Sequence, residues 1–351
     1  MNSPTSDVTP KASISRVTSR DVAVAAGVHQ STVSRALRGD PGVADSTRSM
    51  IKELAKALGY VPNRSARTLR EQGSRVVGVM VDNLDNPFYH LLLAHIHRGV
   101  SEAGYSTVLL VDPLHRRADF SRLERLLDSS LDGLVVSTAA LDSDTPARLV
   151  QQGIPIVLAV RSVPGLDVDI VEPDNRAAGR EAARHLVELG HESIAVIMGP
   201  AVVSTSADRL RGVLEVAGDA IDPQNIVHGQ YSHDSGQSLL QRVMQRESPP
   251  SAIIAGNDII AIGVLDAARR SGIGVPADLS IIGFDDIPMS SWHSFRLTTV
   301  HQDVQGMAAQ AARCLIERIQ NPDHRPAHYR YPASLTVRGT TAPPRSAHTP
   351  R

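Results

Sequence analysis

The chain has 351 residues, with 36 lysines and arginines against 37 aspartates and glutamates, and 42% of it is hydrophobic. This composition excludes a disordered protein, and at roughly 100 to 200 residues per domain the length predicts two or three domains. The single cysteine, Cys314, cannot form an intrachain disulfide or a cysteine-rich zinc site, which is typical of a reducing compartment. We expect its thiol to be buried as a small hydrophobic group.

The charge is distributed unevenly along the chain. Residues 1–75 carry a net charge of +6 and the remainder −7. Because nucleic acids attract basic surfaces, this asymmetry indicates a small nucleic-acid-facing module joined to a larger acidic body. No apolar run approaches the ~20 residues needed to cross a bilayer, and the polar N-terminus has no hydrophobic signal segment. The sequence therefore predicts a cytoplasmic protein without membrane contact.

The first elements in the chain are short helices. After a disordered arm over residues 1–15, rich in serine, threonine and proline, Ser19 caps a first helix that ends at Gly27. A second helix follows over residues 29–37, and a third begins near Asp45 and closes a small core. Two helices joined by a glycine turn are typical of a helix-turn-helix DNA reader, although a helical cap on the body would have the same pattern.

The second helix has an apolar face and a polar face. Its outward side chains are those of Gln30, Ser31, Thr32 and Arg35. In the major groove an arginine can grip guanine with two hydrogen bonds and a glutamine can read adenine. We therefore expect Arg35 and Gln30 to contact bases.

Beyond Ser74, apolar segments of strand length alternate with amphipathic segments of helix length. The candidate strands are residues 76–81, 106–111, 134–137, 155–160, 194–197, 252–255 and 280–284. Continuously apolar strands separated by helices predict parallel sheets covered on both faces, an α/β fold. The body is long for one sheet, and a break near residues 171–175 predicts two doubly wound lobes with a ligand between them.

Polar residues stand where several of these strands end. Arg161 follows one strand, Arg209 follows the loop behind another, and Asn257 and Asp285 end two more. Because ligands of α/β proteins bind at the carboxyl ends of the strands, these groups predict a cleft for a polyhydroxylated or anionic ligand. Phe88 and Tyr89 follow the first strand and are predicted at the rim of the cleft, although core aromatics would have the same pattern.

The N-terminal motifs resemble those of one known family. They include Asp21-Val-Ala, Ala26-Gly-Val28, Ser31-Thr-Val-Ser-Arg35, Leu58-Gly-Tyr60 and Pro62-Asn63. Together they resemble the headpiece of the LacI/GalR family of bacterial transcriptional repressors, and the likeness covers about nine-tenths of the chain. The resemblance implies an all-α helix-turn-helix headpiece over residues 16–62, a hinge helix and linker over 63–73, and a two-lobed α/β domain over 74–341 that is similar to periplasmic sugar-binding proteins.

The resemblance also implies how the lobes are divided. The N-lobe spans about 75–172 and 302–331, the C-lobe spans about 173–301 and 332–341, and residues 342–351 form a flexible tail.

For DNA, the resemblance implies base reading by Gln30, Ser31 and Arg35. It implies contacts with the DNA backbone by Ser19, Thr32, Ser34 and Asn63. In the hinge helix, Ala66 and Leu69 take minor-groove positions, with Leu69 as a wedge between bases. The alternative is that Leu69 is a linker residue that touches the body. A homodimer on a pseudo-palindromic operator is the expected assembly, and a dimer is favoured over a tetramer because the C-terminus has no heptad pattern.

For the effector, the resemblance implies contacts with Arg209, Asn257 and Asp285. Gln302 matches a cleft or crossover position, and Tyr231 an aromatic wall. Sugar-binding members often carry aspartate immediately before the residue that matches Arg161, whereas this chain has Val160. That departure weakens the assignment to a sugar and points toward a less hydroxylated, anionic or nucleoside-like ligand. The expected effector is therefore a sugar, a sugar phosphate or a nucleoside-like metabolite. The only tryptophan, Trp292, is expected to report ligand entry by its fluorescence.

Other classes of protein fit the sequence less well. Asp285 and Asp286 look like a catalytic carboxylate pair, but neighbouring residues at a strand end point in different directions, and we expect Asp286 to cap local backbone. Hydrolase, phosphate-loop and dinucleotide motifs are missing, so the sequence predicts neither an enzyme nor a cofactor. A solute-binding protein of a transport system is the main alternative, opposed by the basic headpiece. A regulator that answers to a protein partner is a third.

Overall fold

The computed structural model describes residues 19–37, 40, 42–58, 73–112 and 131–345. The chain divides into two compact units, residues 1–72 and 73–351, and each is described by itself.

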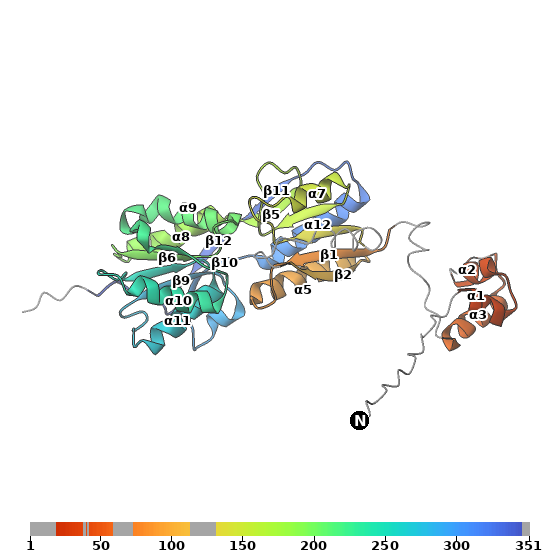
Figure 1. The fold of residues 1–351 in the computed structure, drawn as a ribbon, viewed down its shortest axis with the longest axis horizontal. Coiled ribbons are helices and arrows are strands. Elements are labelled where there is room, and N and C mark those ends of the chain that lie inside the picture. The colour runs from red at the N-terminus through yellow and green to blue at the C-terminus, as the bar shows by residue number, and fades with distance from the viewer. Residues whose placement is uncertain (1–18, 38–39, 41, 59–72, 113–130, 346–351) are drawn as a thin grey trace, which may run out of the picture. The chain divides into compact units, whose positions relative to one another are not determined.

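The first unit contains helices that share a small apolar core, and Figure 1 shows the course of these helices. They are α1 (Ser19–Ala26), α2 (Gln30–Leu37) and α3 (Asp45–Ala57). Val22, Val33 and Ile51, one from each helix, are fully buried against one another. Gly27 has a φ of 63°, a conformation that glycine adopts without strain, and this lets the chain turn sharply from α1 toward α2.

The second unit contains two six-stranded sheets, and each forms one lobe. The first sheet has the order β11-β5-β4-β3-β1-β2, with strands β1 (Val76–Val81), β2 (Ser106–Val111), β3 (Gly133–Val136), β4 (Ile156–Ala159), β5 (Asp169–Pro173) and β11 (His328–Tyr331). The second has the order β12-β10-β9-β8-β6-β7, with strands β6 (Ile194–Met198), β7 (Ile226–His228), β8 (Ala252–Ala255), β9 (Ser280–Asp285), β10 (Thr298–Gln302) and β12 (Ala333–Thr336). Among the strands of the described residues, all pairings are parallel except that of β10 with β12.

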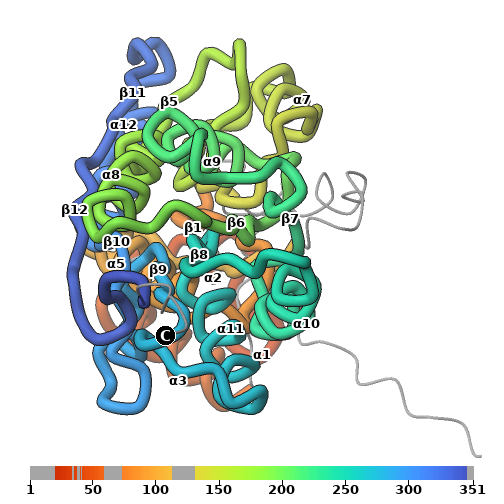
Figure 2. The backbone as a smooth tube through the Cα atoms, turned by 90° about the vertical axis from the view of Figure 1, so that its left-hand side faces the viewer, coloured from red at the N-terminus to blue at the C-terminus, as the bar shows by residue number. Residues whose placement is uncertain are grey.

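Helices cover both sheets. They are α5 (Pro87–Glu102), α7 (Thr145–Gln151), α8 (Asn175–Glu188), α9 (Ser204–Ala217), α10 (His233–Met244), α11 (Asp258–Arg270) and α12 (Val304–Gln320), with short 3₁₀ turns at η1 (Gly218–Ala220), η2 (Pro223–Asn225) and η3 (Pro288–Ser291). In the second lobe α8 and α9 cover one face of the sheet, and α10 and α11 cover the other (Figures 1 and 2). The expected two-lobed α/β fold with mostly parallel sheets is confirmed.

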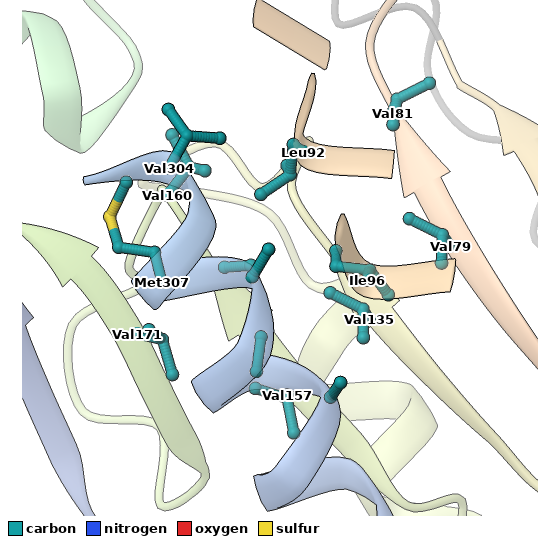
Figure 3. Close-up of a cluster of buried hydrophobic side chains, with 14 of the residues drawn as sticks. Val79, Val81, Leu92, Ile96, Val135, Val157, Val160, Val171, Val304 and Met307 are labelled. Carbon is teal, nitrogen blue, oxygen red and sulfur yellow. The ribbon is translucent and has the colours of Figure 1, made fainter. Parts of the chain in front are cut away.

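The chain crosses between the lobes after β5, β10 and β11. After β10 it leaves the second sheet and enters α12, which packs against α5 and the first sheet. Figure 3 shows this packing: Val304 and Met307 of α12 lie in the same apolar cluster as Leu92 and Ile96 of α5. Because each lobe contains segments from distant parts of the chain, a shift of one lobe acts on several connections at once.

The sequence predicted seven strands, and all of them are present. The strands that it missed are β5, β7, β10, β11 and β12. Most of these carry charged, polar or proline residues, as in Asp169–Pro173 and His328–Tyr331, or are very short, so they lack the continuous apolar pattern of a central strand. Cys314 is buried, as expected. None of the described helices is long and apolar enough to span a membrane.

Candidate functional site

The first candidate surface is the exposed side of α2. Gln30, Ser31 and Arg35 are exposed there and Thr32 is partly buried, while Val33 and Ala36 face the core. The apolar spacing of the helix therefore turns the predicted base-reading side chains to one surface. The side chains of Ser19 and Ser34, and the whole of Asn63, Ala66 and Leu69, lie outside the described part of the chain.

Arg35 has a partner that the sequence did not indicate. Its Nε donates to Asp40 Oδ2 at 2.8 Å, and its Nη2 lies 3.4 Å from Asp40 Oδ1. Asp40 therefore holds the guanidinium mainly by its Nε edge, and its Nη groups can still donate to an acceptor pair such as that of guanine. At the start of α2, Ser31 Oγ lies 2.8 Å from His29 Nδ1.

The second candidate site is a cavity between the lobes. Its volume is about 30 Å³, and its walls are formed by Asn86, Phe88, Tyr89, Val160, Arg161, Thr205, Arg209, Tyr231, Asn257 and Asp285. Seven of the eight predicted effector residues thus line one cavity. The eighth, Gln302, lies behind the wall, where its Nε2 donates to Asp285 Oδ1 at 3.0 Å. The strand-end rule would also have indicated Asp82, at the end of β1, which the sequence reasoning missed.

Phe88 and Tyr89 do not lie at an open rim. They are 4% and 5% exposed, and their rings meet edge to face with centroids 5.7 Å apart. Asn86 caps α5 by accepting a hydrogen bond from the Phe88 backbone N–H, which turns the first residues of the helix inward. The prediction of rim aromatics is therefore wrong, and the alternative of core aromatics fits: both rings belong to the apolar core of the N-lobe and line the cavity from there.

On the N-lobe side, a buried arginine forms part of the cavity wall. Arg161 is 1% exposed, and its Nη2 donates to Asp82 Oδ2 at 3.2 Å and to Tyr89 Oη at 3.1 Å. Burial raises the pKa of Tyr89 to about 12, so the phenol is protonated at neutral pH. The preceding Val160 has a φ of 70°, a strained conformation for a β-branched residue. The chain thus turns abruptly where β4 meets the cavity.

On the C-lobe side a second arginine is held by several acceptors. Arg209 donates from Nε to Asn175 Oδ1 at 3.0 Å, from Nη1 to the Gly256 carbonyl at 2.6 Å and from Nη2 to Asp285 Oδ1 at 3.3 Å. Its guanidinium also stacks over the Phe284 ring, 4.7 Å from the centroid. This network fixes the guanidinium and aligns Asp285 beside the cavity.

The position of Arg209 depends on close helix packing. A Cβ on Gly179 of α8 would overlap the carbonyl oxygen of Arg209, and a Cβ on Gly212 of α9 would overlap that of Arg176. The two glycines therefore let the backbones of α8 and α9 pack in close contact near the position from which the Arg209 side chain extends.

A second carboxylate lies behind Asp285. Asp258 accepts hydrogen bonds from Ser290 Oγ, Thr299 Oγ1 and the Ile287 backbone N–H. Burial raises the pKa of Asp258, and the charge of Asp285 raises it further. Burial also raises the pKa of Asp285, against the opposing effect of Arg209. Asp258 thus ties together the segments after β9 and within β10 that support the cavity wall.

Asp286 and Trp292 have other surroundings than the sequence predicted. Asp286 does not cap local backbone: it accepts from Arg338 Nη2 at 2.6 Å and lies 3.1 Å from His301 Nδ1. Trp292 is 54% exposed, stacks on Phe295 with ring centroids 6.4 Å apart, and is not part of the cavity wall. The side chain therefore lacks the position that would make it a direct reporter of ligand entry.

Known proteins resemble the chain in both units. The family described as bacterial regulatory proteins, lacI family, matches residues 18–63, and the periplasmic binding protein-like domain matches residues 183–341. The HTH-type transcriptional regulator MalR of Streptomyces coelicolor is 32% identical over 335 residues, which cover 92% of this chain and 96% of that protein.

Two solved structures extend the likeness to the whole fold. The complex of the transcriptional regulator CelR with cellobiose has a TM-score of 0.70 at 30% identity, covering 93% of this chain and 100% of the other. The lac repressor dimer bound to operator and the anti-inducer ONPF has a TM-score of 0.78 at 27% identity, covering 93% and 99%.

A helix-turn-helix unit joined to a two-lobed binding domain defines a DNA-binding transcription regulator. This chain belongs to the LacI family of bacterial transcription regulators. The predicted family is confirmed, and so is the expectation that the chain is not an enzyme, because members of this family regulate transcription without catalysis.

Proposed function

We propose that this chain is a cytoplasmic repressor that binds a pseudo-palindromic operator as a homodimer and is controlled by a small-molecule effector in the interlobe cavity. The observation that carries the proposal is the convergence of polar side chains from both lobes on one cavity. The operator-bound dimer of the lac repressor and the cellobiose complex of CelR support it by similarity.

The DNA-reading part of the proposal rests on α2. Its exposed Gln30, Ser31 and Arg35 supply amide, hydroxyl and guanidinium groups that can read base edges. Thr32, Ser34, Ser19 and Asn63 are proposed to contact backbone phosphates. In the proposed hinge over residues 63–73, Ala66 and Leu69 enter the minor groove, so Leu69→Ala should weaken operator binding and bending while leaving effector binding unchanged.

The sensing part of the proposal rests on the size and walls of the cavity. A volume of about 30 Å³ holds little more than a water molecule, whereas sites for small ligands usually measure roughly 300 to 1,000 Å³. An effector of sugar size therefore has to separate the lobes or move the side chains between them. At the lobe contact, the Leu141 N–H donates to the Val202 carbonyl at 2.8 Å and the Ser162 N–H to Ser204 Oγ at 2.9 Å.

Lobe movement gives the effector a route to the DNA-binding unit. The chain passes between the lobes at three places along the described residues, after β5, β10 and β11, so separation of the lobes shifts the start of the N-lobe relative to the C-lobe. We propose that residues 63–73 transmit this shift to the headpieces of the dimer. An effector can drive the change only by binding one lobe arrangement more tightly than the other.

The test is a selection of genomic DNA fragments by the purified chain, followed by titration of the selected operator with and without candidate effectors. We expect tight binding to a two-fold symmetric site, strong weakening by salt, and a change in affinity with an effector. A transport-type solute-binding protein would bind ligand but select no fragment. A regulator that answers to a protein partner would select a fragment and ignore every small molecule.

A further inference from the structure

Arg161 has an unused donor deep inside the cavity wall. Its hydrogen bonds to Asp82 and Tyr89 both leave from Nη2. Its Nη1 is buried and has no hydrogen-bond partner among the residues that the structure describes. A buried guanidinium that is only partly paired is costly, because its charge has lost water without gaining a full set of acceptors.

The first turn of α9 lies beside this arginine. The backbone N–H of Ser162, the residue after Arg161, donates to Ser204 Oγ at 2.9 Å, and Thr205 lines the same cavity. Val203 occupies the N-cap position, and its side chain cannot accept a hydrogen bond from the first-turn N–H groups. The first turn of this 14-residue helix, whose Thr205 lines the cavity, therefore lacks the side-chain cap that usually accepts hydrogen bonds from its N–H groups, and it carries the positive end of the helix dipole.

Within the described part of the chain, the carboxylates around Arg161 leave its Nη1 without a hydrogen-bond acceptor. Asp82 is the carboxylate that pairs with it, and Val160 supplies no second one. Asp285 belongs to the C-lobe wall, where one oxygen already accepts from Arg209 and Gln302. The wall around Arg161 thus combines a free cationic donor with a helix N-terminus, and this pair of features is suited to an anionic oxygen group.

We infer that the effector carries a carboxylate or phosphate group, which Arg161 Nη1 and the first turn of α9 bind together. The inference rests on the proposed effector cavity and specifies its ligand class. The anion becomes the second negatively charged partner of the guanidinium, beside Asp82, and it also lies at the positive end of the α9 dipole. The remainder of the effector faces the wall of Asn257 and Asp285, which suits hydroxyl groups. The ligand class is therefore a polyhydroxylated acid or a sugar phosphate.

The test compares matched neutral and anionic compounds on the purified full chain by isothermal titration calorimetry. The neutral probes are glucose, galactose and mannose; the anionic probes are their uronates, their 6-phosphates and inorganic phosphate. We expect at least one acid to bind about tenfold or more tightly than its neutral parent. Preference for a uronate identifies a carboxylate, and preference for a 6-phosphate identifies a phosphate.

Variants separate the role of Arg161 from general damage. Arg161→Gln should remove the preference for the acid, and Arg161→Gln combined with Asp82→Asn should do the same while leaving no buried carboxylate unpaired. The exposed Arg242→Gln, in the other lobe, is the matched control and should keep the preference. Equal binding of acids and parents, binding of none of the acids, or an acid preference that survives in both Arg161 variants would overturn the inference.

Operator binding by the same preparation is measured in parallel. If the chain binds its operator and responds to the neutral sugars at least as strongly as to their acids, the inference fails and the proposed function stands. If it selects no DNA, the proposed function fails whatever the calorimetry shows.

Discussion

Replacement of Arg209 tests whether the network at the C-lobe wall is as tightly coupled as its geometry indicates. The side chain is 3% exposed and makes hydrogen bonds to Asn175, Gly256 and Asp285. Arg209→Met keeps much of the apolar volume but leaves Asp285 buried without its cation. Loss of one member of a buried ion pair costs about 3 to 5 kcal/mol, so we expect the free energy of unfolding to fall by that amount.

A second substitution relieves the unpaired charge. In the double variant, Arg209→Met combined with Asp285→Asn, the buried carboxylate is replaced by a neutral amide that does not require a positively charged partner. We therefore expect the double variant to be more stable than Arg209→Met by about 1.5 to 3 kcal/mol. Both variants should lose the effector response, because both remove groups from the cavity wall. The exposed Arg242→Met should change stability by less than about 0.5 kcal/mol and keep the response.

The assay is urea denaturation followed by the fluorescence of Trp292, the only tryptophan of the chain and a residue of the same lobe. Operator titration with and without effector gives the response. If Arg209→Met costs less than about 1 kcal/mol, or if the double variant is no more stable than the single one, the buried pair is not the dominant interaction of Arg209 and the reasoning is refuted.

The remaining predictions concern DNA reading, helix packing and a buried carboxyl group. Arg35→Ala should weaken operator binding by about 1 to 3 kcal/mol and barely affect random DNA in anisotropy titrations; equal losses on both would exclude base reading. Gly179→Ala should lower the free energy of unfolding by about 1 to 3 kcal/mol, because the new Cβ forces α8 from α9, whereas Gly218→Ala, with open space around it, should change little. Burial raises the pKa of Asp258. The folded chain therefore keeps a proton on this carboxyl group at pH values above about 4, where the unfolded chain has released it. The stability that this protonated group contributes is lost as the pH rises. Asp258→Asn should flatten that slope in urea titrations between about pH 5 and pH 8, and an unchanged slope would assign it to other groups.

Local pattern was enough to locate much of this protein. The central strands are continuously apolar because both of their faces are covered, and this property is visible in the sequence without any knowledge of neighbours. The helix-turn-helix spacing around Gly27 and the polar residues after the strands are local features of the same kind. Arg161, Arg209, Asn257 and Asp285 could therefore be assigned to one cavity before the strand order was known.

Tertiary structure alone decided which groups are partners. The Arg161–Asp82 pair joins residues from the ends of two different strands, and Arg35 is held by Asp40 from the loop after α2. No repeating pattern in the sequence indicates either pair, because each pair depends on how separate segments meet in space. The same reason explains why Phe88 and Tyr89 are buried in the N-lobe core instead of lying at the rim of the cleft, and why the polar strands at the lobe crossings were missed. Sequence determined the elements and the chemistry at their ends, whereas packing determined burial, pairing and the unused donor of Arg161.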